Sequence, residues 1–341
     1  MGRMGGFPTV RCLRQMQTGD RRRAGRLKRY PVLSASLNPP LRKPIRRVKR
    51  IASCVLLKPK SHNRVPANAE RKPLLSPFRY PGGKTWLRPI IRKWLKRPVA
   101  QLIEPFGGGA VISLTALNEG LTKQAIILER DPSVASVWAS MLNGEATWLC
   151  RKIQDFKATP TSVRIELQRR VRSPRMLAWV TLLRNRVSHG GLLARGAGLL
   201  KKGEAGNGVK SRWYPDTLGA RIRAIHALKR RIRFSETDAL VWLCKYGRRN
   251  RRSQTAIFID PPYSMTGKRL YEYGEIDHQR LFEIASRLRG RVLMTYDDSA
   301  EIRKLARKSG FKYRRVPMRS RHHVSKCELL ISKDFKWLNA K

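Results

Sequence analysis

The chain has 341 residues, with 74 Lys and Arg against 23 Asp and Glu, so its formal charge is +51. Its hydrophobic fraction of 41% is enough for a packed core, which excludes a wholly disordered chain. The sequence has no run of about 18 apolar residues that could span a membrane and no secretion signal, so we expect a cytoplasmic protein without a membrane partner. The excess positive charge favours nucleic acid as the partner, because binding it releases counterions.

The first 70 residues are the most basic part of the chain. They hold 18 Lys and Arg against Asp20 and Glu70, a net charge of +16 that leaves +35 in the other 271 residues. Scattered prolines and the lack of a period of 2 or 3.6 predict a disordered leader over 1–70. Three interpretations stay open: a basic arm that adds affinity for nucleic acid, an organellar transit peptide, or an over-extended reading frame.

Cysteine and histidine spacing gives no sign of a metal site. The five cysteines are far apart and include no Cys-x-x-Cys pair, which predicts reduced thiols. The pair His322-His323 has no carboxylate or cysteine partner at ligand spacing, so we interpret it as surface. The cysteines are Cys12, Cys54, Cys150, Cys244 and Cys327.

An α/β pattern begins near Leu74. Gln101–Phe106 is an apolar, strand-like run, a triple glycine follows it, and Ala110–Asn118 has helical character. Ala125–Glu129 and Ala256–Asp260 are short and apolar, as parallel strands covered on both faces should be. The order of strand, glycine turn and helix predicts a doubly wound, mostly parallel sheet.

The C-terminal part repeats this rhythm. Asp277 is suited to cap a helix that ends near Gly290, and Arg291–Tyr296 is the next predicted strand. A second helix begins at Asp298 or Ser299 and stops at Gly310. The predicted strands 312–318 and 327–332 then form an antiparallel hairpin at the sheet edge.

Between these parts the alternation of strands and helices is lost. Residues 141–235 are mainly helical in pattern and include a glycine-rich passage at 190–208. We interpret this segment as an inserted module that divides the remaining domain into 71–140 and 236–341.

The tetrapeptide Asp260-Pro261-Pro262-Tyr263 is the most informative motif. It follows a predicted buried strand, and open α/β sheets bind ligands outside the carboxyl ends of their strands. The two prolines hold the chain rigidly as it leaves the sheet. A carboxylate and a prolyl carbonyl can each accept a hydrogen bond from an exocyclic amine, while a tyrosine ring stacks on a base.

Two further segments are suited to a nucleotide-type cofactor. Glu104–Ala110 joins the first strand to its helix, and its glycines allow a ligand close to the backbone. Glu129 ends the second strand, where an acidic side chain commonly accepts hydrogen bonds from ribose hydroxyls, and we prefer it to Asp131, which has the context of a helix start. Upstream, Phe78–Lys84 has the composition of a loop that wraps a ligand.

In this order the motifs resemble the Dam-like DNA adenine-N6 methyltransferases, and the resemblance runs from about Leu74 to Leu338. It implies a Rossmann-like methyltransferase fold, S-adenosyl-L-methionine as methyl donor, and 141–235 as a target-recognition module for double-stranded DNA. The segments that carry it are Phe78–Lys84, Glu104–Ala110, Glu129–Pro132, Asn185-Arg186 with Gly190-Gly191, Asp238-Ala239, Asp260–Tyr263, Leu293–Ser299 and Glu328–Ser332.

The resemblance also implies roles for individual residues. Asp260, Pro261, Pro262 and Tyr263 would hold the target base, with Asp260 also beside the cofactor. The ribose residue of the family is usually Asp in an Asp-x-Asn context, whereas this chain has Glu129 in Glu-Arg-Asp. The expected cofactor residues are Tyr80 and Lys84 in the pocket, Phe106, Gly107 and Gly109 along the methionine portion, Glu129 on the ribose and Asp238 near the adenine.

The chemistry follows from the amine. Hydrogen bonds from both amino protons to Asp260 and to the Pro261 carbonyl would localise the N6 lone pair toward the sulfonium methyl, so direct in-line transfer needs no covalent enzyme intermediate. The base must swing out of the duplex to be reached. No cysteine is placed in the catalytic motif, which argues against cytosine-C5 methylation.

Two alternatives stay open. One is cytosine-N4 methylation, which also attacks an exocyclic amine. The other is a catalytically silent nucleic-acid-binding protein with the same fold. A cognate restriction endonuclease is a further candidate partner, and the sequence defines neither the target bases nor the oligomeric state.

Overall fold

The computed structural model describes residues 73–79, 83–193, 197–203, 206–249, 254–262, 275–319 and 325–339. All of them belong to one compact unit, Pro66–Lys341. The predicted leader lies outside these ranges, as do Tyr80, Tyr263 and His322-His323.

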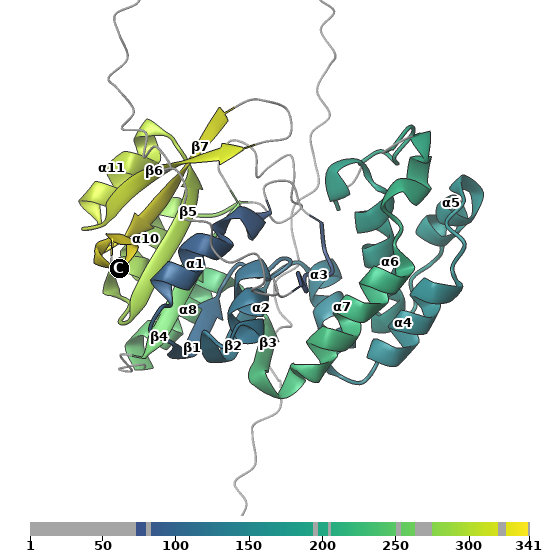
Figure 1. The fold of residues 1–341 in the computed structure, drawn as a ribbon, viewed down its shortest axis with the longest axis horizontal. Coiled ribbons are helices and arrows are strands. Elements are labelled where there is room, and N and C mark those ends of the chain that lie inside the picture. Colours follow the sequence, from purple (N-terminus) through teal and green to yellow (C-terminus); the bar gives the residue numbers. More distant parts are fainter. Residues whose placement is uncertain are drawn as a thin grey trace, which may run out of the picture. The chain divides into compact units, whose positions relative to one another are not determined.

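A seven-stranded sheet has the order β3-β2-β1-β4-β5-β7-β6 (Figure 1). The first five strands in this order are parallel, whereas β7 runs antiparallel to both β5 and β6. This sheet is doubly wound and mostly parallel, with a Rossmann-like arrangement, which confirms the predicted fold class. The strands are β1 (Val99–Glu104), β2 (Thr122–Glu129), β3 (Ile232–Glu236), β4 (Thr255–Ile259), β5 (Arg291–Asp297), β6 (Lys312–Arg319) and β7 (Ser325–Ser332).

Helices cover both faces of the sheet. Successive strand residues point to opposite faces, and in β4 this sends Phe258 to one core and Ile257 and Ile259 to the other. The first core lies under α1 (Arg88–Trp94), α2 (Val111–Asn118) and α12 (Lys336–Asn339). The second lies under α8 (Ala239–Arg249), α10 (His278–Arg287) and α11 (Ala300–Lys308). Burial on both faces explains why β4 is apolar from Ala256 to Ile259.

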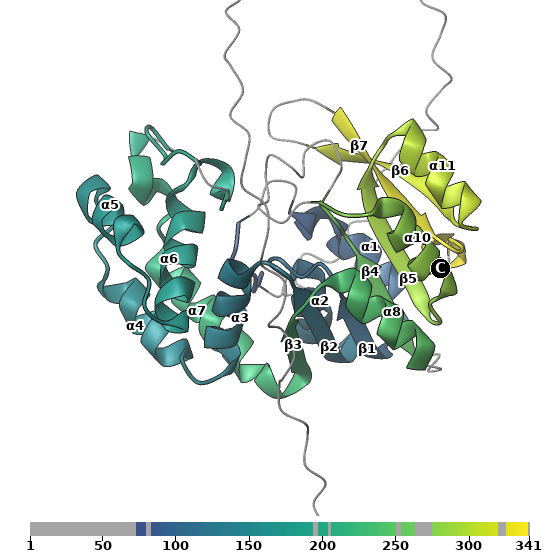
Figure 2. The same cartoon turned by 180° about the vertical axis from the view of Figure 1, so that it is seen from behind.

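The remaining helices form a cluster beside β2 and β3, seen from behind in Figure 2. Here α3 packs on α6 and α7, and α4 packs on α7. Their shared core includes Trp138, Trp179 and Ile222 and extends to Ile127 of β2. The helices are α3 (Pro132–Leu142), α4 (Ala146–Asp155), α5 (Pro160–Gln168), α6 (Pro174–Val187) and α7 (Pro215–Ala227), and all except α4 begin at a proline, whose fixed φ suits the first helical position.

The helix starts predicted near the C-terminus are confirmed. Asp277 accepts a hydrogen bond from the Arg280 amide at 2.8 Å and caps α10. Ser299 accepts one from the Ile302 amide at 3.2 Å and caps α11. The hairpin of β6 and β7 is also confirmed, with β6 at the edge of the sheet and β7 between β6 and β5.

The sheet differs from the predicted one at β3. We placed the end of the inserted segment at 235, but β3 begins at Ile232 and pairs with β2 from Ala125 to Glu129. This edge strand buries little of itself, with only Ile232 buried, so it has no apolar run. The first strand also ends at Glu104 and not at Phe106, because Pro105 cannot donate to the ladder.

Candidate active site

One edge of the sheet carries the predicted site. The parallel strands β1 to β5 all end at this edge, and the antiparallel β7 brings Glu328 to it opposite Asp297. In a chain with a net charge of +51, the edge is notably acidic. In the order of the strands, its carboxylates include Asp238, Glu129, Glu104, Asp260, Asp297 and Glu328.

The strand order places β1 next to β4 at the centre of this edge. The helix after β1 covers one face of the sheet, and the helix after β4 covers the other. Such a switch point leaves a crevice for ligands at the carboxyl ends of open α/β sheets. The glycine loop after β1 and Asp260 after β4 therefore flank the position where a ligand is expected.

Asp260 is held by its neighbours directly after β4. Its Oδ1 accepts a hydrogen bond from Thr295 Oγ1 at 2.7 Å and lies 3.2 Å from Lys84 Nζ. Lys84 begins the short 3-10 helix η1 (Lys84–Leu87), and its Nζ is also 3.5 Å from Glu328 Oε1. The Asp260 side chain is 24% exposed, against 8% for Lys84 and 2% for Glu328. The Asp260 carboxylate is therefore held by Thr295 and Lys84 and is still partly exposed.

Burial and charge act in opposite directions in this group. Burial disfavours the ammonium of Lys84, but Asp260 and Glu328 outweigh it and raise the pKa of Lys84. Burial raises the pKa of Glu328 to about 7, with Lys84 opposing the shift and Asp260 adding to it. Glu328 therefore changes its charge near neutral pH, whereas Lys84 stays cationic.

The glycine loop is fixed at both ends. A Cβ on Gly107 would lie 2.6 Å from Ile127 Cγ2 and 2.8 Å from the Leu128 carbonyl oxygen, so only glycine fits there. Ala110 has φ 42°, in the left-handed region, and as the residue before α2 it offers no capping side chain. Glu104 supplies the cap from β1, because its Oε2 accepts the Ser113 amide at 2.7 Å.

Burial raises the pKa of Glu104 to about 8, with hydrogen bonds from Ser113 opposing the shift. Because the folded-state pKa lies above the ordinary value of 4.5, this carboxyl stabilises the fold fully below about pH 4.5 and loses that contribution as pH rises through 8. Glu104→Gln should remove this loss, since the amide oxygen can still accept the Ser113 amide. The difference in free energy of unfolding between Glu104→Gln and the parent protein should grow in favour of the variant as pH rises from 4.5 to 8. Each pH unit adds about 1.4 kcal/mol, so the total is several kcal/mol. Urea unfolding across this range measures the difference, and a difference independent of pH would contradict the assignment.

Glu129 ties the second strand to the glycine loop. Its Oε2 accepts the Gly108 amide at 2.8 Å, and its Oε1 accepts the amides of Arg130 at 2.8 Å and Asp131 at 2.9 Å. Burial nevertheless raises the pKa of this carboxyl, with the Asp131 amide opposing the shift. A carboxylate has about four lone-pair positions, so three hydrogen bonds from backbone amides leave room for one from a ligand hydroxyl.

Asp238 lies at the end of β3, next to the end of β2. Its Oδ1 accepts the Val241 amide at 3.0 Å at the start of α8, and its Oδ2 is 3.2 Å from Arg130 Nη1. The Thr237 amide donates to the Glu129 carbonyl at 2.9 Å, which brings the two strand ends together. Asp131 begins α3 by accepting the Ser133 amide, as its sequence context predicted.

The structure thus brings together, on one edge, the site residues that it describes. Those that sequence reasoning did not assign are Glu328, Thr295 and Glu104. Glu328 was noted only as part of a C-terminal motif, and a buried acidic residue in an otherwise apolar strand is the signal that could have found it. Tyr80 and Tyr263 lie outside the described residues, so their roles stay predictions.

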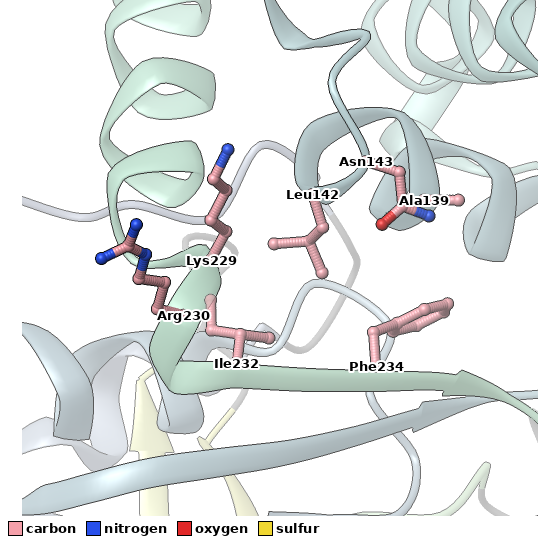
Figure 3. Close-up of a pocket in the computed structure, with 7 residues that line it drawn as sticks. All are labelled: Ala139, Leu142, Asn143, Lys229, Arg230, Ile232 and Phe234. Carbon is pink, nitrogen blue, oxygen red and sulfur yellow. The ribbon is translucent and has the colours of Figure 1, made fainter. Parts of the chain in front are cut away.

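A pocket of about 200 Å³ lies away from this edge (Figure 3). It is at the amino end of β3, with Leu142, Ile232 and Phe234 as its apolar lining, while the guanidinium of Arg230 points away from them. The other lining residues are Ala139, Asn143 and Lys229. Because ligands of such sheets bind at carboxyl ends, we do not assign this pocket to the active site.

Within the described ranges, no group of three or more His, Cys, Asp or Glu side chains is arranged to hold a metal ion. Cys150, Cys244 and Cys327 are free thiols. Among the helices that the structure describes, none combines the length and the apolar character needed to cross a membrane.

No protein-family model matches the chain, and no curated protein matches its sequence. Solved structures with a similar fold include a SAM-dependent methyltransferase from Agrobacterium tumefaciens, at 12% identity and TM-score 0.34, over 72% of this chain and 59% of that one. An rRNA methyltransferase from Streptomyces viridochromogenes matches at 13% identity and TM-score 0.34, over 74% of this chain and 86% of that one. TrmK of M. capricolum, in complex with S-adenosyl-homocysteine, matches at 8% identity and TM-score 0.31, over 72% of this chain and 68% of that one. This chain spans less than two thirds of the Agrobacterium protein, and at these identities the likeness concerns the fold alone.

Proposed function

We propose that the protein transfers a methyl group from S-adenosyl-L-methionine to the exocyclic N6 of adenine in double-stranded DNA. The observation that carries the proposal is Asp260, which is held by Thr295 and Lys84 at the carboxyl end of β4 and is followed directly by Pro261. A rigid carboxylate beside a prolyl carbonyl can accept both protons of an amine. Because a proline cannot continue the strand, this carbonyl is at the edge and not in the ladder.

The edge residues are suited to the cofactor. S-adenosyl-L-methionine supplies the methyl group, and its sulfonium gives a neutral thioether as a good leaving group. The Asp260 carboxylate, which is 24% exposed, favours a ligand that carries a sulfonium and an ammonium. Gly107 and Gly108 allow close approach to the backbone beside α2, and Glu129 can accept from the ribose while it holds Gly108 at 2.8 Å. In this proposal Asp238, after β3, lies near the adenine of the cofactor.

Asp260 also explains how the reaction can proceed without a covalent intermediate. As the new C–N bond forms and the C–S bond breaks, positive charge develops on N6, and a carboxylate already fixed in place stabilises it without reorganisation. The surplus proton leaves N6 after transfer, with the Asp260 carboxylate as the nearest acceptor that we assign. The target base must leave the duplex to reach this edge, and Tyr263 is the predicted stacking partner.

The net charge of +51 supports a polyanionic substrate, and α3 to α7 are the proposed reader of the DNA sequence. Methyl transfer from radiolabelled cofactor to long duplexes of mixed sequence tests the proposal, because such duplexes include target bases that the sequence does not define. Product identified as N6-methyladenine by mass spectrometry supports it. Product found only on cytosine would identify an N4 methyltransferase, and product only in RNA of the same sequence would refute DNA as substrate.

The basic residues 1–70 offer a separate test. Their removal lowers the charge by 16, because they hold 18 Lys and Arg and two acids. We expect the shortened protein, which keeps the edge residues, to retain methyl transfer at low salt. Its DNA affinity should fall less steeply with salt, because each lost phosphate contact reduces the slope by about 0.9. Titrations from low to physiological salt measure this slope, and loss of folding on truncation would contradict our interpretation of the leader.

A further inference from the structure

Residues 75–79, which precede Lys84 in the chain, are bound to the helical cluster by polar contacts. The Arg79 amide donates to Asn185 Oδ1 at 2.9 Å, and Asn185 Nδ2 donates back to the Arg79 carbonyl at 2.9 Å. The same Nδ2 donates to the Gly191 carbonyl at 2.7 Å. Asn185 lies in the last turn of α6 and is fully buried. One side chain therefore pairs with the main chain of Arg79 as a neighbouring strand would.

Two arginines extend this contact toward the N-terminal side. Arg186 Nη2 donates to the Pro77 carbonyl at 2.5 Å, and Arg221 Nη1 of α7 donates to the Ser76 carbonyl at 3.1 Å. Burial lowers the pKa of Arg186, with Arg221 as the next cause, so the cost of burying this guanidinium must be offset by its contacts. The carbonyls of Ser76, Pro77 and Arg79 are thus all bound by side chains of α6 or α7.

Apolar packing and a close backbone contact complete the arrangement. Leu75 and Phe78 are buried in the same core as the helices of the cluster. Gly191, at φ +76°, approaches the segment so closely that a Cβ would lie 2.2 Å from the Arg79 carbonyl oxygen. Residues 75–79 therefore have one conformation against α6 and α7.

The other end of this segment belongs to the catalytic edge. Lys84, five residues after Arg79, contacts Asp260, and the following Leu87 and Ile91 pack in the core under α1 and α2. Five residues span at most about 18 Å, so the fixed main chain at Arg79 limits where Lys84 can be. Residues 75–79 and residues 84–91 thus pack in two different cores, the first in the helical cluster and the second under α1 and α2.

From these contacts we infer that Asn185 is a positioning residue, which holds residues 76–79 on the helical cluster and so keeps Lys84 on Asp260. The expected effect of Asn185 on catalysis rests on the proposed function, whereas its effect on the position of Lys84 does not. It assigns a role to the Asn185-Arg186 motif, which is about a hundred residues from the segment in sequence and not among the edge residues. The helices proposed to read DNA would then be coupled to the group that holds the target amine.

The test measures the position of Lys84 without relying on activity. Full-length Asn185→Ala protein is treated with a limiting amount of an acetylating reagent, and the labelling rate of Lys84 is measured by mass spectrometry. In the parent protein we expect slow labelling, since Lys84 is buried and bonded to Asp260. In the variant we expect it to rise at least about fivefold, with kcat for methyl transfer reduced and the Kd for cofactor changed less than kcat. Arg221→Gln, which loses the contact to Ser76 but leaves the contacts of Asn185 in place, should show the same effects to a smaller extent.

A matched control separates positioning from general destabilisation. Ser211→Ala removes a partly buried hydrogen bond to the Gly208 carbonyl, at 2.7 Å, in the 3-10 helix Gly208–Arg212, which packs on α6. Ser211 has no contact to residues 76–79. The variant should leave Lys84 labelling and kcat unchanged. Unchanged Lys84 labelling in folded Asn185→Ala protein, or in Arg221→Gln if the first variant does not fold, would overturn the inference. If labelling responds but the parent protein methylates none of the duplexes, the positioning role stands and the proposed function fails.

Discussion

Replacing Asp260 by alanine is expected to lower the rate of methyl transfer by about 10²- to 10³-fold, the usual effect of losing one preorganised group at a reacting centre. The carboxylate is proposed to accept one proton of the target amine and to stabilise the charge that develops on N6. Asp260→Asn keeps the size of the side chain but loses its charge, so it should be nearly as impaired. Single-turnover measurements with saturating DNA and cofactor report this step directly.

Binding measurements distinguish a chemical role from a structural one. Gly107 and the bond from Gly108 to Glu129 stay in place in either variant, so cofactor affinity should change less than the rate of methyl transfer. Asp334→Ala is a suitable control, because this carboxylate accepts the Lys336 amide at 3.0 Å at the opposite edge of the sheet. It should cost about 1 kcal/mol of stability and no activity. Unchanged turnover in Asp260→Asn would remove Asp260 from the mechanism.

The fold could be predicted from the sequence where the signals are local. The strand β4 is apolar from Ala256 to Ile259 and is followed by Asp260 and two prolines, and the glycine loop follows β1. The rule that ligands bind at the carboxyl ends of strands was therefore enough to expect both motifs at one edge. Helix caps such as Asp277 are equally local. The strand β3 was missed because an edge strand with one buried residue shows no apolar run.

The contacts within the site could not be predicted in this way. Lys84 and Glu328 are 244 residues apart, and their contact depends on β7 returning antiparallel beside β5. The resemblance assigned Lys84 to the cofactor pocket, which stays a prediction, and the structure adds a contact with Asp260 that the sequence did not predict. Asn185 and Arg79 are likewise 106 residues apart, and only the packing of α6 shows why the motif in the helical cluster matters to the edge.

The pair Lys84 and Glu328 leads to a second prediction with a large effect, which also depends on the proposed function. Burial raises the pKa of Glu328 to about 7, so Glu328 loses its charge as pH falls through neutrality. The charge of Glu328 then no longer attracts Lys84, which competes more strongly with the target amine for the Asp260 carboxylate. We therefore expect kcat to rise with pH around 7 in the parent protein. Glu328→Gln should fix the low-pH arrangement, giving a lower kcat without this rise.

A double variant tests whether the effect passes through the lysine. Lys84→Met leaves the Asp260 and Glu328 carboxyls facing each other without a cation, so they favour a shared proton, and activity should fall and recover only at higher pH. Adding Glu328→Gln to Lys84→Met removes the like charge beside Asp260. The double variant should therefore be more active at pH 7 than Lys84→Met alone, although each change by itself lowers activity. Additive losses in the double variant, or a rise around pH 7 that persists in Glu328→Gln, would show that Glu328 does not control Asp260 through Lys84.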